Sequence, residues 1–354
     1  MGTSKASDRD FMSIENIKST VTKHLFIINP MSFRRKTYMD AIIRDIHSCF
    51  DAPDSADYEI YVSRFPRAAI GKIREYAEKA GNGAIIRVYA VGGDGILFDC
   101  LNGVIGLPNA ELAVIPYGNS NDFVRTFGAK KEELFRDIEA QIRSRTIPAD
   151  AILCGSSYAL NTCTIGIDAY MVHKAAELNA RYARYWNRAS SRTRKFMHNL
   201  IFFASVLISS FAFKIKNQSY TVLIDGKDAS GQYAAIAIST APCYDGGKNG
   251  AGPAMPDDSR INVELSKSVT PFNVIRFGME RINKKHNKSP PHISYIVESE
   301  ITVRSENPLV LQLDGEILLD TNITVKIIPA AVRLVMAGDI PEDDTYEGRA
   351  ESRE

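Results

Sequence analysis

AIIRVYAVGGDG, residues Ala84–Gly95, is a largely apolar, β-rich run that ends in a glycine-rich turn. The run Ala84–Val91 is typical of a strand that is buried in a parallel sheet. Apolar residues at helical spacing follow the turn and predict a helix over 96–105. A strand, a tight turn and a helix in this order form the repeating unit of a parallel sheet covered by helices.

The same unit recurs on both sides of this stretch, between Lys23 and about Pro148. Strand-like runs alternate with helical patterns there, so the sequence predicts an α/β domain with a parallel sheet. The expected strands are His24–Asn29, Tyr58–Ser63, Ala84–Val91 and Glu111–Pro116, and the expected helices cover 35–50, 68–80, 96–105 and 131–143.

From about Ala149 the pattern changes to many short strand-like runs separated by Gly, Pro, Asn and Asp. Near the C-terminus these include ITVRS, LVLQLDG, EILL, ITVKIIP and VRLVM, each read as a separate strand. Helical patterns interrupt the strands near 169–203 and 271–284. Many strands with turn signals between them predict an antiparallel sandwich or barrel.

The composition is that of an ordinary globular protein, with 45% apolar and 24% charged residues among 354. The 43 Lys and Arg residues against 42 Asp and Glu give a net charge of +1, which argues against a dedicated nucleic-acid binder. The five cysteines include no C-x-x-C pair, so we expect a reducing, cytoplasmic environment rather than a disulfide framework. We expect a flexible arm over 1–22 and an acidic tail over 338–354.

The turn Gly92-Gly93-Asp94-Gly95 allows two interpretations. Glycines at the carboxyl end of a parallel strand let backbone N–H groups approach a phosphate, and the helix N-terminus that follows favours an anion. An aspartate in the same turn can hold the magnesium ion that accompanies phosphates. The alternative is a tight turn that needs glycine only for its backbone angles. The chain contains no G-x-x-x-x-G-K-[ST] loop and no strand-linked G-x-G-x-x-G, which removes the main argument for a dinucleotide fold.

A second polar loop, PYGNSNDF (116–123), follows the next expected strand. Because the carboxyl ends of parallel strands meet at one edge of the sheet, this loop should lie beside the glycine-rich turn. Asn121 and Asp122 offer amide and carboxylate groups to a ribose, a phosphate or a metal ion. The alternative is that Asp122 only caps a short helix.

A third stretch, Asp314-Gly315-Glu316, reads first of all as a hairpin turn between two strands. Asp225-Gly226 has the same pattern, which shows how common the turn is. Glu316 adds a carboxylate that is suited to act as a general base on a hydroxyl. From these residues alone, the turn interpretation is favoured.

Read together and in order, the three stretches resemble the diacylglycerol-kinase catalytic family, which includes bacterial lipid kinases and sphingosine kinases. The resemblance spans Lys23 to Val335. The matching segments are Asn29–Ser32 (N-P-x-S-G), Gly92–Gly95 with Asp99 and Asn102-Gly103 (G-G-D-G-T-x-x-E-x-x-N-G), Pro116–Arg125 (P-x-G-T-x-N-D-F-A-R), Gly166 with Asp168-Ala169, Gly246-Gly247 with Ala254 and Asp257-Asp258, and Asp314–Glu316 (D-G-E).

The resemblance implies a role for each matching position. Glu316 would take the hydroxyl proton, with Asp314 in support and Asp122 as a further catalytic residue. Asp94 and Asp122 would hold the catalytic Mg²⁺, and a second, structural Mg²⁺ would lie at Asp258 and at backbone carbonyls near Met255 and Arg260. The residues that would face the nucleotide are Asn29, Ser32, Ser63, Gly92, Gly93, Asp94, Gly95, Asn119 and Asn121.

The fold implied is an α/β N-terminal nucleotide-binding domain with a parallel sheet, over 23–148, plus a C-terminal antiparallel β-sandwich domain over 149–322. Strands in 323–337 would return to the first domain. The function implied is an ATP-dependent lipid kinase that phosphorylates diacylglycerol or a similar lipid with Mg²⁺.

Two other functions stay open at this point. One is a kinase of a soluble acceptor, of the NAD or sugar-phosphate type, because related folds share the G-G-D-G turn. The other is a non-catalytic nucleotide or lipid sensor, because Ile96 and Asn119 stand where the family has threonines.

A basic segment, RYARYWNRASSRTRK (Arg181–Lys195), contains six basic residues and no acidic one. It is suited to peripheral contact with an anionic membrane, and the alternative is a solvated helix face. The apolar run Leu200–Phe213 has fourteen residues, fewer than the roughly 17–25 that a spanning helix needs. We therefore expect a cytoplasmic protein that visits the inner membrane face for its lipid, binds no nucleic acid and is compatible with a homodimer.

Overall fold

The computed structural model describes residues 21–33, 35–50, 57–118, 120–127, 132–186, 218–241, 255–267, 292–297 and 299–336, with isolated residues at 193–208 and 243–249. The predicted acidic tail and the predicted arm, except Val21 and Thr22, lie outside this range. Asn119 and most of Arg181–Lys195 also lie outside it.

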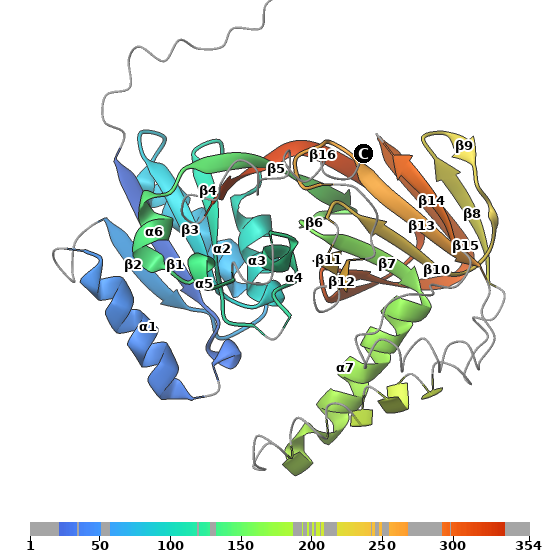
Figure 1. The fold of residues 1–354 in the computed structure, drawn as a ribbon, viewed down its shortest axis with the longest axis horizontal. Coiled ribbons are helices and arrows are strands. Elements are labelled where there is room, and N and C mark those ends of the chain that lie inside the picture. The colour runs from blue at the N-terminus through green and yellow to red at the C-terminus, as the bar shows by residue number, and fades with distance from the viewer. Residues whose placement is uncertain are drawn as a thin grey trace, which may run out of the picture.

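The first domain is built on a sheet in which β1 (Thr22–Ile28), β2 (Tyr58–Val62), β3 (Ile85–Gly92) and β4 (Ala110–Pro116) pair in parallel, in the order β4-β3-β1-β2. Alternate residues of each strand face opposite sides of the sheet, and both sides are buried. One side packs on α1 (Lys36–Ser48), and the other packs on α2 (Ala68–Ala80) and α3 (Asp94–Val104), as Figure 1 shows.

One predicted helix of this domain was wrong in its extent. The helix expected over 131–143 is divided into α5 (Glu132–Phe135) and α6 (Ile138–Arg143), and α4 (Asp122–Thr126) precedes them. The break occurs because Asp137 is extended and its carboxylate accepts the backbone N–H of Ala140 at 2.9 Å. Such a side-chain cap starts a new helix.

The second domain is strand-rich and antiparallel. Its interior is formed by β-branched and leucine side chains from alternate positions of the strands. Its elements are β5 (Thr146–Cys154), β6 (Ser157–Ala159), β7 (Thr162–Gly166), α7 (Ile167–Trp186), β8 (Ser219–Ile224), β9 (Lys227–Asp228), β10 (Gly231–Ser239), β11 (Cys243–Tyr244), β12 (Lys248–Asn249), β13 (Ile261–Lys267), β14 (His292–Val297), β15 (Glu300–Leu313) and β16 (Glu316–Val335).

The separate short strands expected near the C-terminus are in fact two long ones, β15 and β16. Their pairing skips from Arg304–Asn322 to Leu309–Asp320, so four residues bulge out of β15. Pro308 lies in this bulge, where its missing N–H does not interrupt the ladder. A bulge bends a strand without ending it, which a list of short apolar runs does not reveal.

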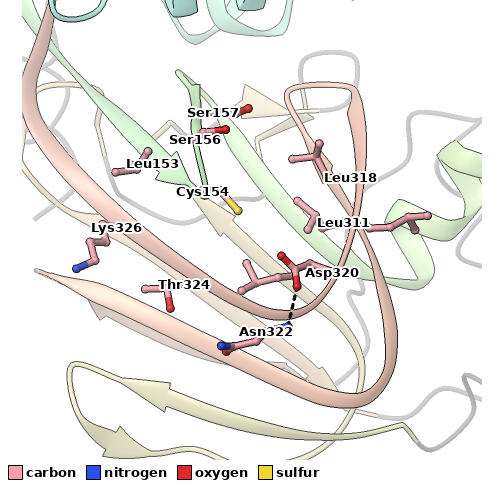
Figure 2. Close-up of a pocket in the computed structure, with 13 residues that line it drawn as sticks. Leu153, Cys154, Ser156, Ser157, Leu311, Leu318, Asp320, Asn322, Thr324 and Lys326 are labelled. Carbon is pink, nitrogen blue, oxygen red and sulfur yellow. Dashed lines mark hydrogen bonds between the residues drawn. The ribbon is translucent and has the colours of Figure 1, made fainter.

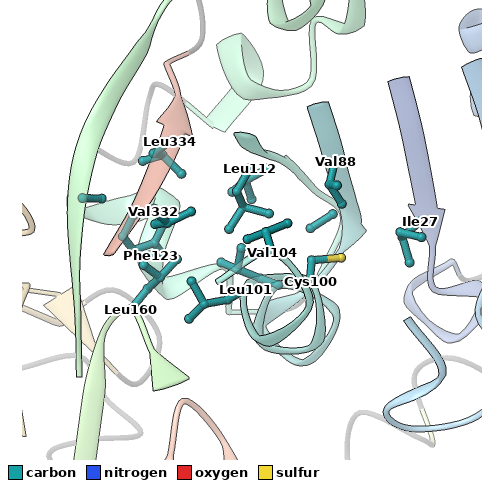
Figure 3. Close-up of a cluster of buried hydrophobic side chains, with 14 of the residues drawn as sticks. Ile27, Val88, Cys100, Leu101, Val104, Leu112, Phe123, Leu160, Val332 and Leu334 are labelled. Carbon is teal, nitrogen blue, oxygen red and sulfur yellow. The ribbon is translucent and has the colours of Figure 1, made fainter. Parts of the chain in front are cut away.

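The long strand β16 joins the two domains. It pairs with β15 and β5 in the second domain, and its last residues pair in parallel with β4 of the first. In Figure 3, Val332 and Leu334 of β16 lie in the same buried cluster as Leu101 and Leu112. One continuous strand therefore connects the start of β16, in the second domain, with the core of the first domain (Figure 1).

Helix α7 leaves the second domain beside β7 and extends away from it (Figure 1). Its first residues are buried, and exposed residues appear from Ala176 onward. Among the helices of the described residues, none combines the length and the apolar character that crossing a membrane requires.

Candidate active site

Three loops of the first domain meet at the carboxyl ends of β1, β3 and β4. The backbone N–H of Asn29 donates to Val91 O at 3.0 Å. The N–H groups of Tyr117 and Gly118 both donate to Gly92 O, at 2.7 and 3.1 Å. The stretches that the sequence singled out around Asn29, Gly92 and Gly118 thus form one connected surface.

Glycine is required in these loops because the backbones touch. A Cβ on Gly93 would lie 2.9 Å from the Cα of Gly118, and a Cβ on Gly118 would lie 2.4 Å from the Cα of Gly93. Gly93 has a φ of −106°, which any residue adopts. Glycine is therefore needed at position 93 because a side chain would not fit, and not because of the backbone angles. A Cβ on Gly92 would lie 2.8 Å from Ser32 Oγ, so Ser32 also lies against the turn.

Asp94 begins α3 and fixes the second loop. Its two carboxylate oxygens accept the N–H groups of Asn121 and Asp122, at 3.0 and 2.9 Å. Burial raises the pKa of Asp94 to about 6, and the neighbouring carboxylate of Asp122 contributes to the rise. A partly buried pair of carboxylates of this kind is energetically suited to a cation.

Asn121 shapes the loop from inside. It is 3% exposed and adopts a left-handed φ of 50°, which asparagine tolerates. Its side-chain oxygen accepts the N–H of Gly118 at 3.0 Å, and its amide nitrogen donates to Gly118 O and to Glu132. Its amide group is engaged within the protein, so Asn121 positions the backbone that a nucleotide would meet.

The other predicted nucleotide positions occupy the same edge. The Asn29 side chain accepts the N–H of Met31 at 3.0 Å and stabilises the first loop. Ser63 is 7% exposed at the end of β2, and its hydroxyl donates to Phe65 O at 3.3 Å. The ring of Phe33 lies 5.2 Å from that of Tyr117, so two aromatic side chains flank the loops.

The Asp314-Gly315 turn brings the second domain to this edge. Both residues have positive φ, 45° and 94°, as a tight two-residue hairpin requires. The Asp314 carboxylate accepts three backbone N–H groups of the β6–β7 connection, from Leu160 (2.7 Å), Asn161 (3.2 Å) and Thr162 (2.7 Å). Burial raises the pKa of Asp314 to about 7, the nearby Asp94 carboxylate adds to the rise, and the three hydrogen bonds oppose it.

Glu316 follows this turn and faces the glycine-rich turn of the first domain. A Cβ on Gly95 would lie 4.0 Å from Glu316 Oε1. Arg67 Nη2 donates to Glu316 Oε2 at 3.4 Å. The Glu316 side chain is 40% exposed, so it remains accessible to a substrate. The structure thus places the predicted base of the second domain beside the predicted phosphate turn of the first.

The residues expected at a second metal site form a closed turn. The Asp258 carboxylate accepts the N–H groups of Met255 and Arg260, at 3.0 and 2.9 Å. Asp150, which the sequence did not single out, lies beside it and accepts the N–H groups of Ser259 and Ala330. Two neighbouring carboxylates fit a cation, although backbone amides already engage both of them.

The described residues contain no group of three or more His, Cys, Asp or Glu side chains arranged to hold a metal ion. A magnesium ion at the candidate active site would therefore rely on Asp94 and Asp122, with remaining ligands from substrate phosphates and water, which is usual for Mg²⁺. The donor chemistry of this pair fits the ion.

A pocket of about 450 Å³ lies beside the same hairpin, between the β5–β6 turn and strands β15 and β16 (Figure 2). Leu153, Leu311, Leu318 and Ile323 line it, and Leu319, which is 64% exposed, lies at its surface. Polar side chains of β16 complete the wall. The sequence did not predict this pocket, because its lining comes from two strand pairs, β5–β6 and β15–β16, that are distant from each other in the chain.

Arg67, like Asp150, was not singled out by the sequence. It lies in the loop between β2 and α2, and nothing in its local sequence distinguishes it from the exposed Arg64 three residues earlier. Only the fold shows that its guanidinium reaches both Asp99 and Glu316.

Comparison with known proteins matches both domains of the chain. Residues 23–154 match the diacylglycerol kinase catalytic domain, and residues 176–336 match the YegS C-terminal NAD kinase beta sandwich-like domain. The Bacillus subtilis protein named "Putative lipid kinase YtlR" is 26% identical over 279 residues, which cover 75% of this chain and 82% of that protein. A Staphylococcus haemolyticus protein, also named "Putative lipid kinase", is 22% identical over 273 residues, with the same coverage of 75% and 82%.

A crystal structure titled "putative diacylglycerol kinase" from Bacillus anthracis superposes with a TM-score of 0.65 at 19% identity. It covers 92% of this chain and 99% of that one, so the two share a fold across both domains. The prediction of an α/β domain followed by a β-sandwich-like domain is confirmed at this level. The two domain matches and the relatives lead to one conclusion: the chain belongs to the diacylglycerol kinase catalytic-domain family.

Proposed function

We propose that the protein is a lipid kinase that transfers the γ-phosphoryl group of ATP to a hydroxyl of diacylglycerol or a similar lipid. The observation that carries the proposal is the position of Glu316, a carboxylate of the second domain next to Gly95 of the glycine-rich turn. A base on one domain and a phosphate-binding turn on the other define a place for an acceptor hydroxyl between them.

In this proposal, backbone N–H groups of the glycine-rich turn and the N-terminus of α3 bind the nucleotide phosphates. Phe33 and Tyr117 offer aromatic faces beside the same loops. Asp94 and Asp122 would hold Mg²⁺, which would offset the negative charge of the phosphates.

Glu316 accepts the proton as the O–H bond of the acceptor breaks, and the hydroxyl oxygen forms a bond to the γ-phosphorus. The bond from that phosphorus to the β–γ bridging oxygen breaks, and ADP leaves with the electron pair. Asp314 keeps the hairpin in register through its three amide hydrogen bonds, so Glu316 stays aimed at the first domain.

A lipid acceptor is supported by the leucine and isoleucine side chains that line part of the pocket next to this hairpin (Figure 2). Leu318 and Leu319 follow Glu316 by two and three residues, so the pocket begins about 7–10 Å along β16 from the base, at roughly 3.3 Å per residue. That distance lets an acyl chain enter the pocket while the lipid hydroxyl reaches Glu316.

The pocket assignment is tested with Leu319→Glu, which changes an exposed side chain and leaves the core intact. We expect the KM for the lipid to rise about tenfold while the KM for ATP stays the same. Tyr38→Glu on α1, also an exposed apolar position, is the matched control. An equal KM for the lipid in both variants would contradict the placement of the acyl chain in this pocket.

Because the acceptor resides in a bilayer, we propose that Arg181–Lys195 contacts an anionic surface from the cytoplasmic side. Binding to phosphatidylglycerol vesicles that weakens with salt is the expected result. Equal binding to neutral phosphatidylcholine vesicles would contradict it.

The acceptor class is tested by transfer of ³²P from γ-labelled ATP. The wild-type protein is offered a total lipid extract, diacylglycerol in mixed micelles, NAD and a sugar phosphate. We expect label in a lipid. Label in NAD or in the sugar phosphate alone would favour a soluble acceptor, and ATP binding without transfer to any acceptor would favour a sensor.

A further inference from the structure

Arg67 has a backbone conformation that its side chain does not favour. It precedes α2 with a φ of 66° and a ψ of −2°, in the left-handed region. Crowding between Cβ and the backbone makes this region costly for residues other than glycine, asparagine and aspartate. A long side chain kept in such a conformation indicates a constraint imposed by its contacts.

Those contacts join the two domains. The backbone N–H of Arg67 donates to Asp99 Oδ2 at 2.8 Å, and its Nη1 lies 3.6 Å from Asp99 Oδ1. The guanidinium carbon lies 4.4 Å from the centre of the Phe98 ring, so the group is stacked on α3. The remaining nitrogen, Nη2, reaches Glu316 Oε2 in the second domain at 3.4 Å.

Asp99 is well placed to hold the guanidinium. Its side chain is 9% exposed, and burial raises its pKa, an effect that the Arg67 backbone and charge oppose. A buried carboxylate needs a cationic partner, and Arg67 supplies one from a fixed direction. The guanidinium is thus fixed by α3 on one side while it donates to Glu316 on the other.

We propose that Arg67 is a positioning residue, which Asp99 and Phe98 hold so that its guanidinium orients the Glu316 carboxylate over Gly95. The inference rests on the proposed role of Glu316 as the base. A carboxylate that is 40% exposed samples several rotamers, and a hydrogen bond from a fixed donor selects one of them. Arg67 touches neither the acceptor nor the nucleotide in this account.

The key variant is Arg67→Gly, because glycine suits the left-handed backbone and the protein should still fold. We expect kcat to fall about 10- to 100-fold, by analogy with the loss that follows removal of a residue that orients a metal ligand. The KM for ATP should change by less than threefold. The protein should stay folded with a moderate fall in melting temperature, because glycine keeps the backbone N–H that donates to Asp99 and suits the left-handed backbone, while Asp99 loses its cationic partner. Arg64→Gly, in the same loop at an exposed position, should behave as the wild-type protein.

Two further measurements separate positioning from a general structural effect. Guanidinium chloride at millimolar concentration should restore part of the kcat of Arg67→Gly, and it should leave the kcat of Glu316→Gln unchanged. In a Glu316→Gln background, Arg67→Gly should have no further effect, because its target is gone.

The outcomes also distinguish this inference from the proposed function. If Glu316→Gln is inactive and Arg67→Gly keeps kcat within twofold of wild type, the inference about Arg67 fails and the role of Glu316 stands. A tenfold rise in the KM for ATP at unchanged kcat would make Arg67 a nucleotide ligand and overturn the inference. If Glu316→Gln is fully active, the proposed base is wrong, and the inference fails with it.

Discussion

Two Asp-Gly hairpins of the second domain have the same local structure and different surroundings. Asp225 and Asp314 both have a φ of 45°, and each is followed by a glycine with positive φ. In both, the aspartate N–H donates to a carbonyl of a neighbouring segment, and the carboxylate accepts N–H groups from that segment. As turns, the two are interchangeable.

The difference lies in what the turn is packed against. Asp225 is exposed and bonds to Ser299 and Glu300 within the second domain. Asp314 is close enough to Asp94 of the first domain for the two carboxylates to interact. The residue after the first turn is Lys227, on an open edge, and the residue after the second is Glu316, beside Gly95. A local pattern thus predicts the turn, and the tertiary fold decides whether it carries chemistry.

The largest expected difference between the turns is catalytic. Glu316→Gln removes the carboxylate that accepts the proton and keeps its size, so kcat should fall by about 10²–10⁴, the usual contribution of a general base. Lys227→Gln at the same place in the other turn should leave kcat unchanged. Steady-state rates of lipid phosphorylation for both variants give the comparison, and equal rates would show that the turns do not differ in function.

The next difference is in stability. Asp314→Ala leaves three backbone N–H groups unpaired in a largely buried place, which should lower the free energy of unfolding by roughly 2–4 kcal/mol. Asp225→Ala affects two N–H groups at the surface and should cost about 1 kcal/mol. Urea unfolding of the two variants measures both values. A larger loss of unfolding free energy for Asp225→Ala than for Asp314→Ala would contradict the conclusion that Asp314 holds the more buried turn.

A smaller effect is the dependence of stability on pH. Because burial raises the pKa of Asp314 from 3.8 to about 7, the native state holds its proton more tightly than the unfolded chain does. The contribution of this group to the free energy of unfolding is therefore full below about pH 4 and is lost as the pH rises through 7.

Asp314→Asn should flatten this part of the stability curve, and Lys227→Gln should keep the wild-type slope. Urea unfolding between pH 4 and pH 8 measures the slopes. An unchanged slope in Asp314→Asn would show that another group titrates in this range.

The smallest effects should be equal at the two turns. A Cβ on Gly226 or on Gly315 meets nothing within 4 Å, so only the positive φ, 77° and 94°, opposes alanine. Each Gly→Ala change should cost about 1–2 kcal/mol. Thermal unfolding of the two variants checks this, and a difference above about 1 kcal/mol would show that one hairpin is held by more than its own geometry.

The regular parts of the fold were predictable from sequence, because periodicity reports burial directly. The strand Ala84–Val91 and the helix 68–80 were expected within one residue of β3 and α2. The continuous strand β16 was missed, since the polar residues 320–322 and a bulge near Ala330 divide its apolar pattern. Asp137 divided an expected helix because a side-chain cap is a local contact that periodicity does not report.

The candidate site was predictable only where residue type and order carry information. Gly93 and Asp94 lie in a segment that keeps the order and spacing of the G-G-D-G motif. The structure adds the reason why Gly93 must lack a side chain. Arg67 and Asp150 were missed, because their partners are distant in sequence and nothing local marks them. Residues that act through contacts across domains become visible only in the folded chain.

The most direct test of the account is to separate nucleotide binding from transfer in Glu316→Gln. If Glu316 is the base, ATP should bind to this variant with a dissociation constant within twofold of wild type, measured by calorimetry with Mg²⁺. Transfer of ³²P from γ-labelled ATP to lipid should fall at least a hundredfold. Transfer within threefold of the wild-type rate would contradict the assignment of Glu316 as the base that joins the two domains in one active site.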